Sequence, residues 1–92
     1  MPAVHFKVYG QVQGVGFRYF VLEKAKHFHL KGWIMNHPEG SVEGVLQGSP
    51  DEVSSVLSFI AKGPPGAFVT SIKEKTIPEN PGLSQFSIKS QL

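Results

Sequence analysis

The sequence contains no cysteine among its 92 residues. It therefore offers no disulfide bond, no thiolate nucleophile and no thiolate metal ligand. Long apolar runs are also missing: no stretch approaches the roughly 20 residues that a membrane-spanning helix needs, and the N-terminus has no basic region followed by an apolar one. We therefore expect a cytoplasmic protein with no membrane partner.

An excess of one charge is absent as well. Nine Lys and Arg residues against seven Asp and Glu residues leave a formal net charge of +2, and the lysines are scattered along the chain. This charge does not indicate a nucleic-acid partner, and we predict none. The histidines, His5, His27, His29 and His37, form no pair at the i, i+4 spacing of a helical metal site. We also predict no metal and no cofactor.

What is present is the composition of a globular protein, with 40% hydrophobic and 17% charged residues. A chain of this length can build one hydrophobic core. No repeat, linker or low-complexity tract divides it, so the sequence predicts a single domain over residues 1–92. A monomer is the expected state.

The first half of the chain predicts a strand, a helix and a hairpin. In residues 4–8 apolar and polar side chains alternate, which is typical of a half-buried strand, and this strand ends at Gly10. Residues 16 to about 29 carry apolar side chains at spacings of four, four and three, as in an amphipathic helix, and Gly32 breaks this helix. Residues 33–47 contain two extended stretches around the turn residues His-Pro-Glu-Gly, which predicts a β-hairpin.

The second half predicts another helix and one or two strands. Ser49 and Glu52 have the spacing of a capping box, with a proline at the first helical position, and the helix ends at Gly63. Residues 68–77 form a strand whose outer part, KEKT, is expected to be exposed. Residues 86–88 suggest a short fifth strand or a tail.

This order of elements is that of the ferredoxin-like fold, an α+β βαββαβ sandwich in which an antiparallel sheet carries both helices on one face. A strand-helix-strand unit returns the chain so that its two strands run the same way. The ends of the first and second strands then lie at one edge of the sheet. Arg18 and Asn36 follow these ends, so we expect both to face a common site.

The stretch GQVQGVGFR, residues 10–18, combines flexible backbone, a helix start and a cation. Its three glycines permit positive φ, which can turn backbone N–H groups toward one anion. Arg18 falls in the first helical turn, where free N–H groups and the helix dipole favour an anion, and its guanidinium can bind phosphate through two hydrogen bonds. We predict a phosphate-binding loop formed by Gln13, Gly14, Val15, Gly16, Phe17 and Arg18.

The side chain of Asn36 suits a second role at such a site. An amide cannot act as a base, but it can accept from and donate to a water molecule and so orient it. A carboxylate leaving group, whose conjugate acid has a pKa of about 4, needs no general acid to depart. The sequence shows no convincing acid–base pair. These residues therefore predict hydrolysis of an activated phosphoryl compound directly by water, without a covalent intermediate or a metal.

At these residues the sequence resembles the acylphosphatase family. GQVQGVGFR and GWIMNHPEGSVEGVLQG, residues 32–48, are similar to its two signatures, and GPPGAFV and the closing FSI extend the resemblance over nearly the whole chain. The resemblance implies a small cytoplasmic enzyme that cleaves the carboxyl-phosphate bond of acyl phosphates, with inorganic phosphate as a competitive ligand. It also implies that Arg18 is the catalytic arginine that binds phosphate and Asn36 the catalytic asparagine that orients the water.

Other functions share parts of this pattern. The glycine loop is not the dinucleotide fingerprint, because Tyr19 stands where a third glycine belongs, and it lacks the Gly-Lys-Ser/Thr of a Walker loop. Ferredoxin-like sheets also form RNA-recognition domains, but the strand predicted at residues 41–47 has no aromatic residue on which a base could stack. A non-catalytic phosphate-binding or regulatory module is the remaining alternative.

Overall fold

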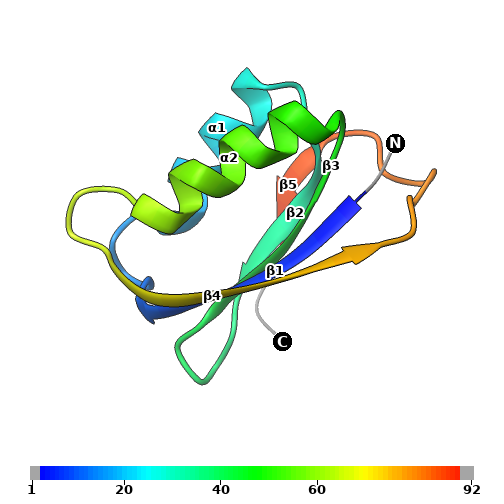
Figure 1. The fold of residues 1–92 in the computed structure, drawn as a ribbon. Coiled ribbons are helices and arrows are strands. Elements are labelled where there is room, and N and C mark those ends of the chain that lie inside the picture. Colours follow the sequence, from blue (N-terminus) through cyan, green and yellow to red (C-terminus); the bar gives the residue numbers. More distant parts are fainter. Residues whose placement is uncertain (1–2, 90–92) are drawn as a thin grey trace.

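The computed structural model describes residues 3–89, in which two helices lie on one side of a twisted sheet (Figure 1). The elements are β1 (Ala3–Gln11), α1 (Phe17–His27), β2 (Lys31–Asn36), β3 (Val42–Gln47), α2 (Pro50–Lys62), β4 (Phe68–Ile77) and β5 (Phe86–Ile88). This order confirms the predicted ferredoxin-like arrangement. Neither helix is long and apolar enough to cross a membrane.

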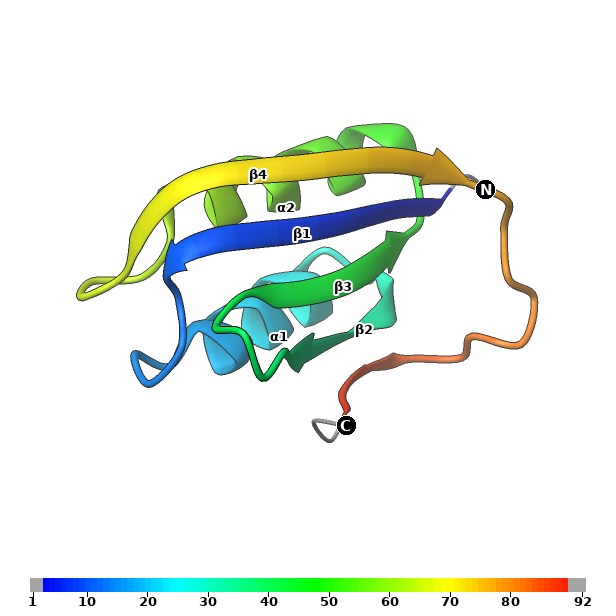
Figure 2. The ribbon, with the colours of Figure 1, turned by 90° about the horizontal axis from the view of Figure 1, so that it is seen from below.

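The strands follow the order β4-β1-β3-β2-β5 across the sheet. β1 is antiparallel to both β3 and β4, and β2 is antiparallel to β3, as predicted. β5 adds a parallel pairing with β2, so the sheet is mixed rather than purely antiparallel. The reason is the long connection after β4, which crosses one end of the sheet and enters beside the start of β2 (Figure 2).

The core lies between the sheet and the helices. Phe6 and Val8 of β1 are fully buried, whereas His5 and Lys7 between them are only half-buried, as the alternation predicts. The helices cover this face with the apolar stripes read from the sequence. Their buried residues are Phe17, Val21 and Ala25 of α1 and Val53, Val56 and Ile60 of α2. This packing fixes the direction in which α1 leaves the loop after β1.

The end of α1 differs from the prediction. The helix ends at His27 rather than near residue 29, because His29 takes the left-handed conformation with φ 59°. Leu30 N then donates to Ala25 O at 2.8 Å, which is the 6→1 hydrogen bond of a Schellman motif. Gly32 does not break the helix but lies within β2. A histidine in the usual glycine position explains why the sequence pattern placed the helix end too late.

A β-bulge marks the end of β1 that leads to the loop. The register against β4 shifts between Tyr9 and Gly10, and Thr70 is the additional residue on β4. Gly10 has φ 125°, and a Cβ there would lie 2.1 Å from Phe68 O. Gly10 therefore permits a close approach of two strands, while the other two glycines of the stretch belong to the loop itself.

Candidate active site

The loop between β1 and α1 brings backbone donors to one place. Gly14 and Gly16 both adopt left-handed φ values, 74° and 75°, as predicted. Gly16 is also the N-cap residue of α1, and the helix has no side-chain cap and no acidic residue in its first turn. The first N–H groups of α1 are therefore not satisfied by a capping side chain, which leaves them available to an anion.

A small cavity of about 130 Å³ opens beside this loop. It is lined by Val12, Gln13, Gly14, Gly16, Phe17, Arg18, Tyr19 and Asn36. Arg18 and Asn36 thus line one cavity although eighteen residues separate them. Figure 2 shows why: the loop after β1 and the turn after β2 lie at the same end of the sheet, because both strands run antiparallel to β3.

Not every residue of the predicted loop lines the cavity. Val15 does not, because its side chain packs against the core. Two lining residues were not in the predicted set. Val12 is completely buried and belongs to the core as well, and Tyr19 is 68% exposed at the rim. The only sign of Val12 in the sequence is that it is a hydrophobic residue in a loop. Such residues more often pack in the core than line a binding site.

Arg18 carries a positive charge that no side chain of residues 3–89 neutralises. Its side chain is half-buried, and within residues 3–89 it makes no hydrogen bond or ion pair. It lies in the first turn of α1, one residue after the start of the helix. A guanidinium has five donors and always carries a charge. Its position therefore favours an anion in the cavity.

Asn36, the last residue of β2, has an unpartnered acceptor. Its Oδ1 is buried and, among the described residues, has no hydrogen-bond partner. A buried acceptor without a donor is unfavourable by about 1–3 kcal/mol. Asn36 lines the cavity, so a water molecule bound there is the simplest donor for this oxygen.

The turn that follows Asn36 is tied to the open face of the sheet. The ring of His37 is hydrogen-bonded to the carboxylate of Glu43, which is also bonded by His5. Burial raises the pKa of the Glu43 carboxyl, but these hydrogen bonds outweigh burial, so its pKa lies below the ordinary value.

In the described part of the chain, no group of three or more acidic, His or Cys side chains could hold a metal ion.

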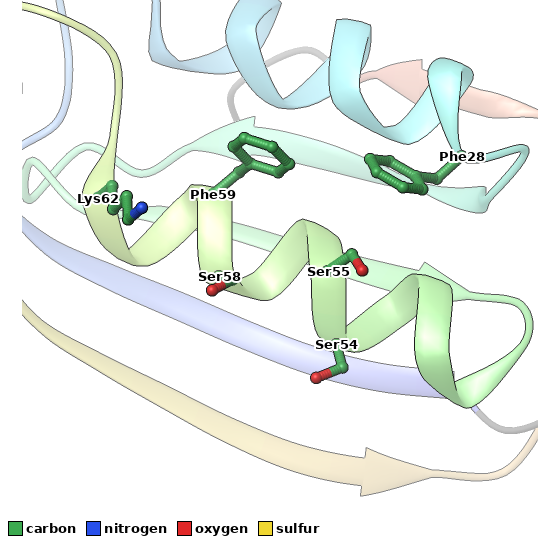
Figure 3. Close-up of a pocket in the computed structure, with 6 residues that line it drawn as sticks. All are labelled: Phe28, Ser54, Ser55, Ser58, Phe59 and Lys62. Atoms are coloured by element: carbon green, nitrogen blue, oxygen red, sulfur yellow. The ribbon is translucent and has the colours of Figure 1, made fainter.

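A larger hollow of about 360 Å³ lies on the outer side of the helices and offers different chemistry (Figure 3). It is lined by Phe28, Ser54, Ser55, Ser58, Phe59 and Lys62. All but one of these residues lie within α2, where backbone N–H groups are engaged in the helix, and Lys62 is at the negative end of the helix dipole. This hollow therefore lacks the backbone donors that the smaller cavity has.

The fold and the smaller cavity define a ferredoxin-like α+β protein that brings an uncapped helix start and an arginine without a partner among residues 3–89 to one site. The Acylphosphatase family model matches residues 4–88. The chain therefore belongs to the acylphosphatase family, and its activity is that of an acylphosphatase, a hydrolase. The family, the fold and this activity are as the sequence predicted.

Individual relatives agree with this assignment. The acylphosphatase of Moorella thermoacetica is 46% identical over 88 residues, which are 96% of this chain and 94% of the relative. That of Thermococcus kodakarensis is 39% identical over 84 residues, 91% of each chain. The crystal structure of acylphosphatase from Bacillus subtilis matches with a TM-score of 0.93 and 36% identity, over 97% of this chain and 99% of that one.

Proposed function

We propose that the 130 Å³ cavity is the site of acyl phosphate hydrolysis, with Arg18 binding the phosphoryl group and Asn36 holding the attacking water. One observation supports this most strongly. A guanidinium and a buried amide oxygen, both without partners among the described residues, line the same small cavity. The first needs an anion and the second needs a donor, and a phosphoryl group with a water molecule supplies both.

The loop and the helix start would bind the phosphoryl oxygens. Backbone N–H groups of residues 13–18 and the bidentate guanidinium of Arg18 can donate to these oxygens, and the dipole of α1 favours their charge. The backbone of Val15 takes part, while its side chain packs against the core. Positioning and charge stabilisation of this kind are most of what phosphoryl transfer requires of a protein.

Asn36 would set the direction of attack. Its Oδ1 accepts a hydrogen bond from the water and turns an oxygen lone pair toward phosphorus. The new P–O bond forms as the bond between phosphorus and the acyl oxygen breaks, and its electron pair leaves with the carboxylate. That group departs as an anion without a general acid, because its conjugate acid has a pKa of about 4. The protons of the water remain with inorganic phosphate and solvent, and the scheme includes no metal or cofactor.

The first test is turnover of a simple aryl acyl phosphate, such as benzoyl phosphate, at neutral pH with a chelator present. We expect hydrolysis well above the spontaneous rate, with inorganic phosphate as a competitive inhibitor. Binding of phosphate without turnover would contradict the proposal and favour a non-catalytic phosphate-binding module.

The second test separates the two roles within the cavity. Asn36→Ala should lower kcat by about 10²-fold, because the water is no longer oriented, while inorganic phosphate still inhibits with its wild-type constant. Asn80→Ala, a change in the connection before β5 and outside the cavity, is the matched control and should change neither. A parallel loss of phosphate affinity in Asn36→Ala would make Asn36 a phosphate ligand instead.

We further propose that residues 1–92 act as one domain and as a cytoplasmic monomer. Arg18 and Asn36 come from the same chain, so one copy supplies both side chains that the scheme needs. The family match over residues 4–88 supports a single unit. Sedimentation equilibrium at micromolar concentration should give the mass of one chain.

A further inference from the structure

The side chain of Gln13 links the two parts of the candidate site. Gln13 lies in the loop after β1, and its Nε2 donates to the backbone oxygens of His37 at 2.7 Å and Ser41 at 2.9 Å. His37 directly follows Asn36 in the sequence. One amide group therefore joins the phosphate loop to the turn that fixes the position of Asn36.

These two bonds complete the hydrogen bonding of the turn. His37 N donates to Ser41 O at 2.9 Å, and Gly40 N donates to His37 O at 3.0 Å. Each of the two carbonyl oxygens thus accepts one bond from the turn itself and one from Gln13. Because both N–H groups of the amide are used, Gln13 has no side-chain donor left for a phosphoryl oxygen. Its remaining oxygen is an acceptor and would repel the anion.

Besides a hydrogen bond within the turn, from Ser41 Oγ to the carboxylate of Glu39, the turn has side-chain contacts with the sheet. Lys7 of β1 forms an ion pair with Glu39 at 3.0 Å, and His37 is bonded to Glu43 of β3. They hold the turn against the strands but not against the loop. Of the side chains of residues 12–16, only Gln13 makes a hydrogen bond to the turn.

We infer that Gln13 is a positioning residue, which sets where Asn36 lies relative to the phosphorus atom. This rests on the proposed function, since it takes Asn36 as the residue that holds the water. In-line attack needs the reacting atoms about 3–3.5 Å apart, and a displacement of about 1 Å can slow a reaction 10²-fold. Phosphate binding does not need Asn36, so the loss of Gln13 slows turnover without weakening the binding of phosphate.

The first measurement compares two glutamines. Gln13→Met keeps the length of the side chain and removes both donors, and we expect kcat to fall by about 10- to 100-fold while the inhibition constant of inorganic phosphate is unchanged. Gln11→Met is the matched control, because Gln11 is exposed at the end of β1 and outside the cavity, and it should behave as wild type. A wild-type kcat in Gln13→Met, or a loss of phosphate affinity equal to the loss of kcat, would overturn the inference.

The second measurement is a double-mutant cycle with Asn36→Ala. If Gln13 acts through Asn36, Gln13→Met lowers kcat little further in the Asn36→Ala background. A merely structural role predicts that the two losses multiply, and that result would overturn the inference. Gln13→Leu, which is uncharged and has no donor, is used for the same cycle if Gln13→Met does not fold.

The outcomes also separate this inference from the proposed function. A wild-type kcat in Asn36→Ala contradicts the role of Asn36 and with it the basis for Gln13. A slow Asn36→Ala together with a fast Gln13→Met overturns only the role of Gln13. Non-additive losses in the cycle, with phosphate affinity retained throughout, are the result that we expect.

Discussion

The two helices of the protein begin in opposite ways. α2 begins at Ser49, whose Oγ accepts from the backbone N–H of Glu52 at 3.4 Å and donates to the carboxylate of Glu52 at 2.7 Å. Its first turn holds two acidic residues, Asp51 and Glu52. α1 begins at Gly16 without a side-chain cap or an acidic residue, and the charge in its first turn is the cation of Arg18.

This difference separates a helix start that the chain completes from one that it leaves open. At α2 a hydroxyl satisfies a free N–H group, and negative charges complement the dipole, so the start stabilises the fold. At α1 a cation lies beside the positive end of the dipole, which is unfavourable until an anion is bound. The predictions below test whether the two starts are divided in this way between ligand binding and stability.

The largest effect is expected at the open start. Arg18→Ala should lower kcat/KM by about 10³-fold or more and weaken inhibition by phosphate, because the loop keeps its amides but loses the bidentate cation. Arg18→Lys keeps the charge without the planar guanidinium, so its kcat/KM should lie between those of wild type and Arg18→Ala. Steady-state kinetics with a phosphate titration measure both effects.

The control for Arg18 is a cation elsewhere on the helices. Lys26→Ala removes an exposed positive charge from the last turn of α1, at the opposite end of the helix from Arg18 and outside the cavity, and should leave the kinetics unchanged. Wild-type kinetics in Arg18→Ala, or equal losses in both variants, would show that the start of α1 is not the phosphate site.

A smaller effect is expected from the loop backbone that leads into α1. Gly14 has φ 74°, and a Cβ there would meet nothing within 4 Å, so a substitution is opposed by backbone conformation and not by contact. Gly14→Val should weaken phosphate binding by about tenfold and lower the free energy of unfolding by about 1–2 kcal/mol. A phosphate titration measures the binding, and urea unfolding measures the stability. An unchanged phosphate titration would contradict the role of this loop in binding phosphate.

The closed start should affect stability alone. Ser49→Ala removes the cap of α2 and should cost about 1 kcal/mol in the free energy of unfolding, with kcat/KM unchanged. Ser58→Ala, an exposed serine within the same helix, is the matched control and should not destabilise the protein. A large loss of activity in Ser49→Ala would contradict the proposal that the start of α2 contributes to stability and only the start of α1 to ligand binding.

The smallest effect concerns pH and Glu43 of β3, whose carboxylate is hydrogen-bonded to His37 in the turn after Asn36. Burial raises the pKa of Glu43, but hydrogen bonds from His37 and His5 lower it by more, to below the ordinary 4.5. The unfolded chain therefore takes up a proton first as pH falls, so the stability due to Glu43 is present above pH 4.5 and is lost as pH falls through the folded-state pKa. Glu52 at the start of α2 has no such pair of histidines.

The variant Glu43→Gln does not titrate and tests this dependence. The difference in free energy of unfolding between wild type and Glu43→Gln should narrow between neutral pH and about pH 3, by less than about 1 kcal/mol because the group is partly exposed. Urea unfolding at the two pH values measures it. A difference that stays constant with pH would show that the histidines do not stabilise the charged carboxylate.

Much of this architecture could be predicted from local patterns. The capping box of α2, the alternation in β1 and the order of the elements depend on residues close together in the sequence, and the structure confirms them. The proximity of Arg18 and Asn36 followed from topology, because a strand-helix-strand unit aligns the ends of its two strands. The Schellman end of α1 was missed, since His29 adopts a conformation for which glycine is the usual signal.

Contacts between distant side chains could not be predicted in the same way. Nothing near Gln13 in the sequence indicates that its amide reaches two carbonyls more than twenty residues away. The parallel partner of β5 depends on the path of the connection before it. The unpartnered oxygen of Asn36 is visible only when the surroundings of the side chain are known. The kind of chemistry was therefore predictable from the sequence, but the way in which the two parts are held together was not.

The β-bulge opposite Gly10 also determines which side chain of β4 points toward the core near the start of α1. Side chains of a strand alternate between faces, and one additional residue reverses that alternation beyond it. Ile72 packs against the core, and after Thr70 the inward position falls to Val69, so that Phe68 points outward and is 65% exposed. Without the bulge, the regular alternation from Ile72 would turn Thr70 and Phe68 inward and Val69 outward. One additional residue on this edge strand thus determines whether a valine or a phenylalanine packs beneath the start of α1 and the candidate site.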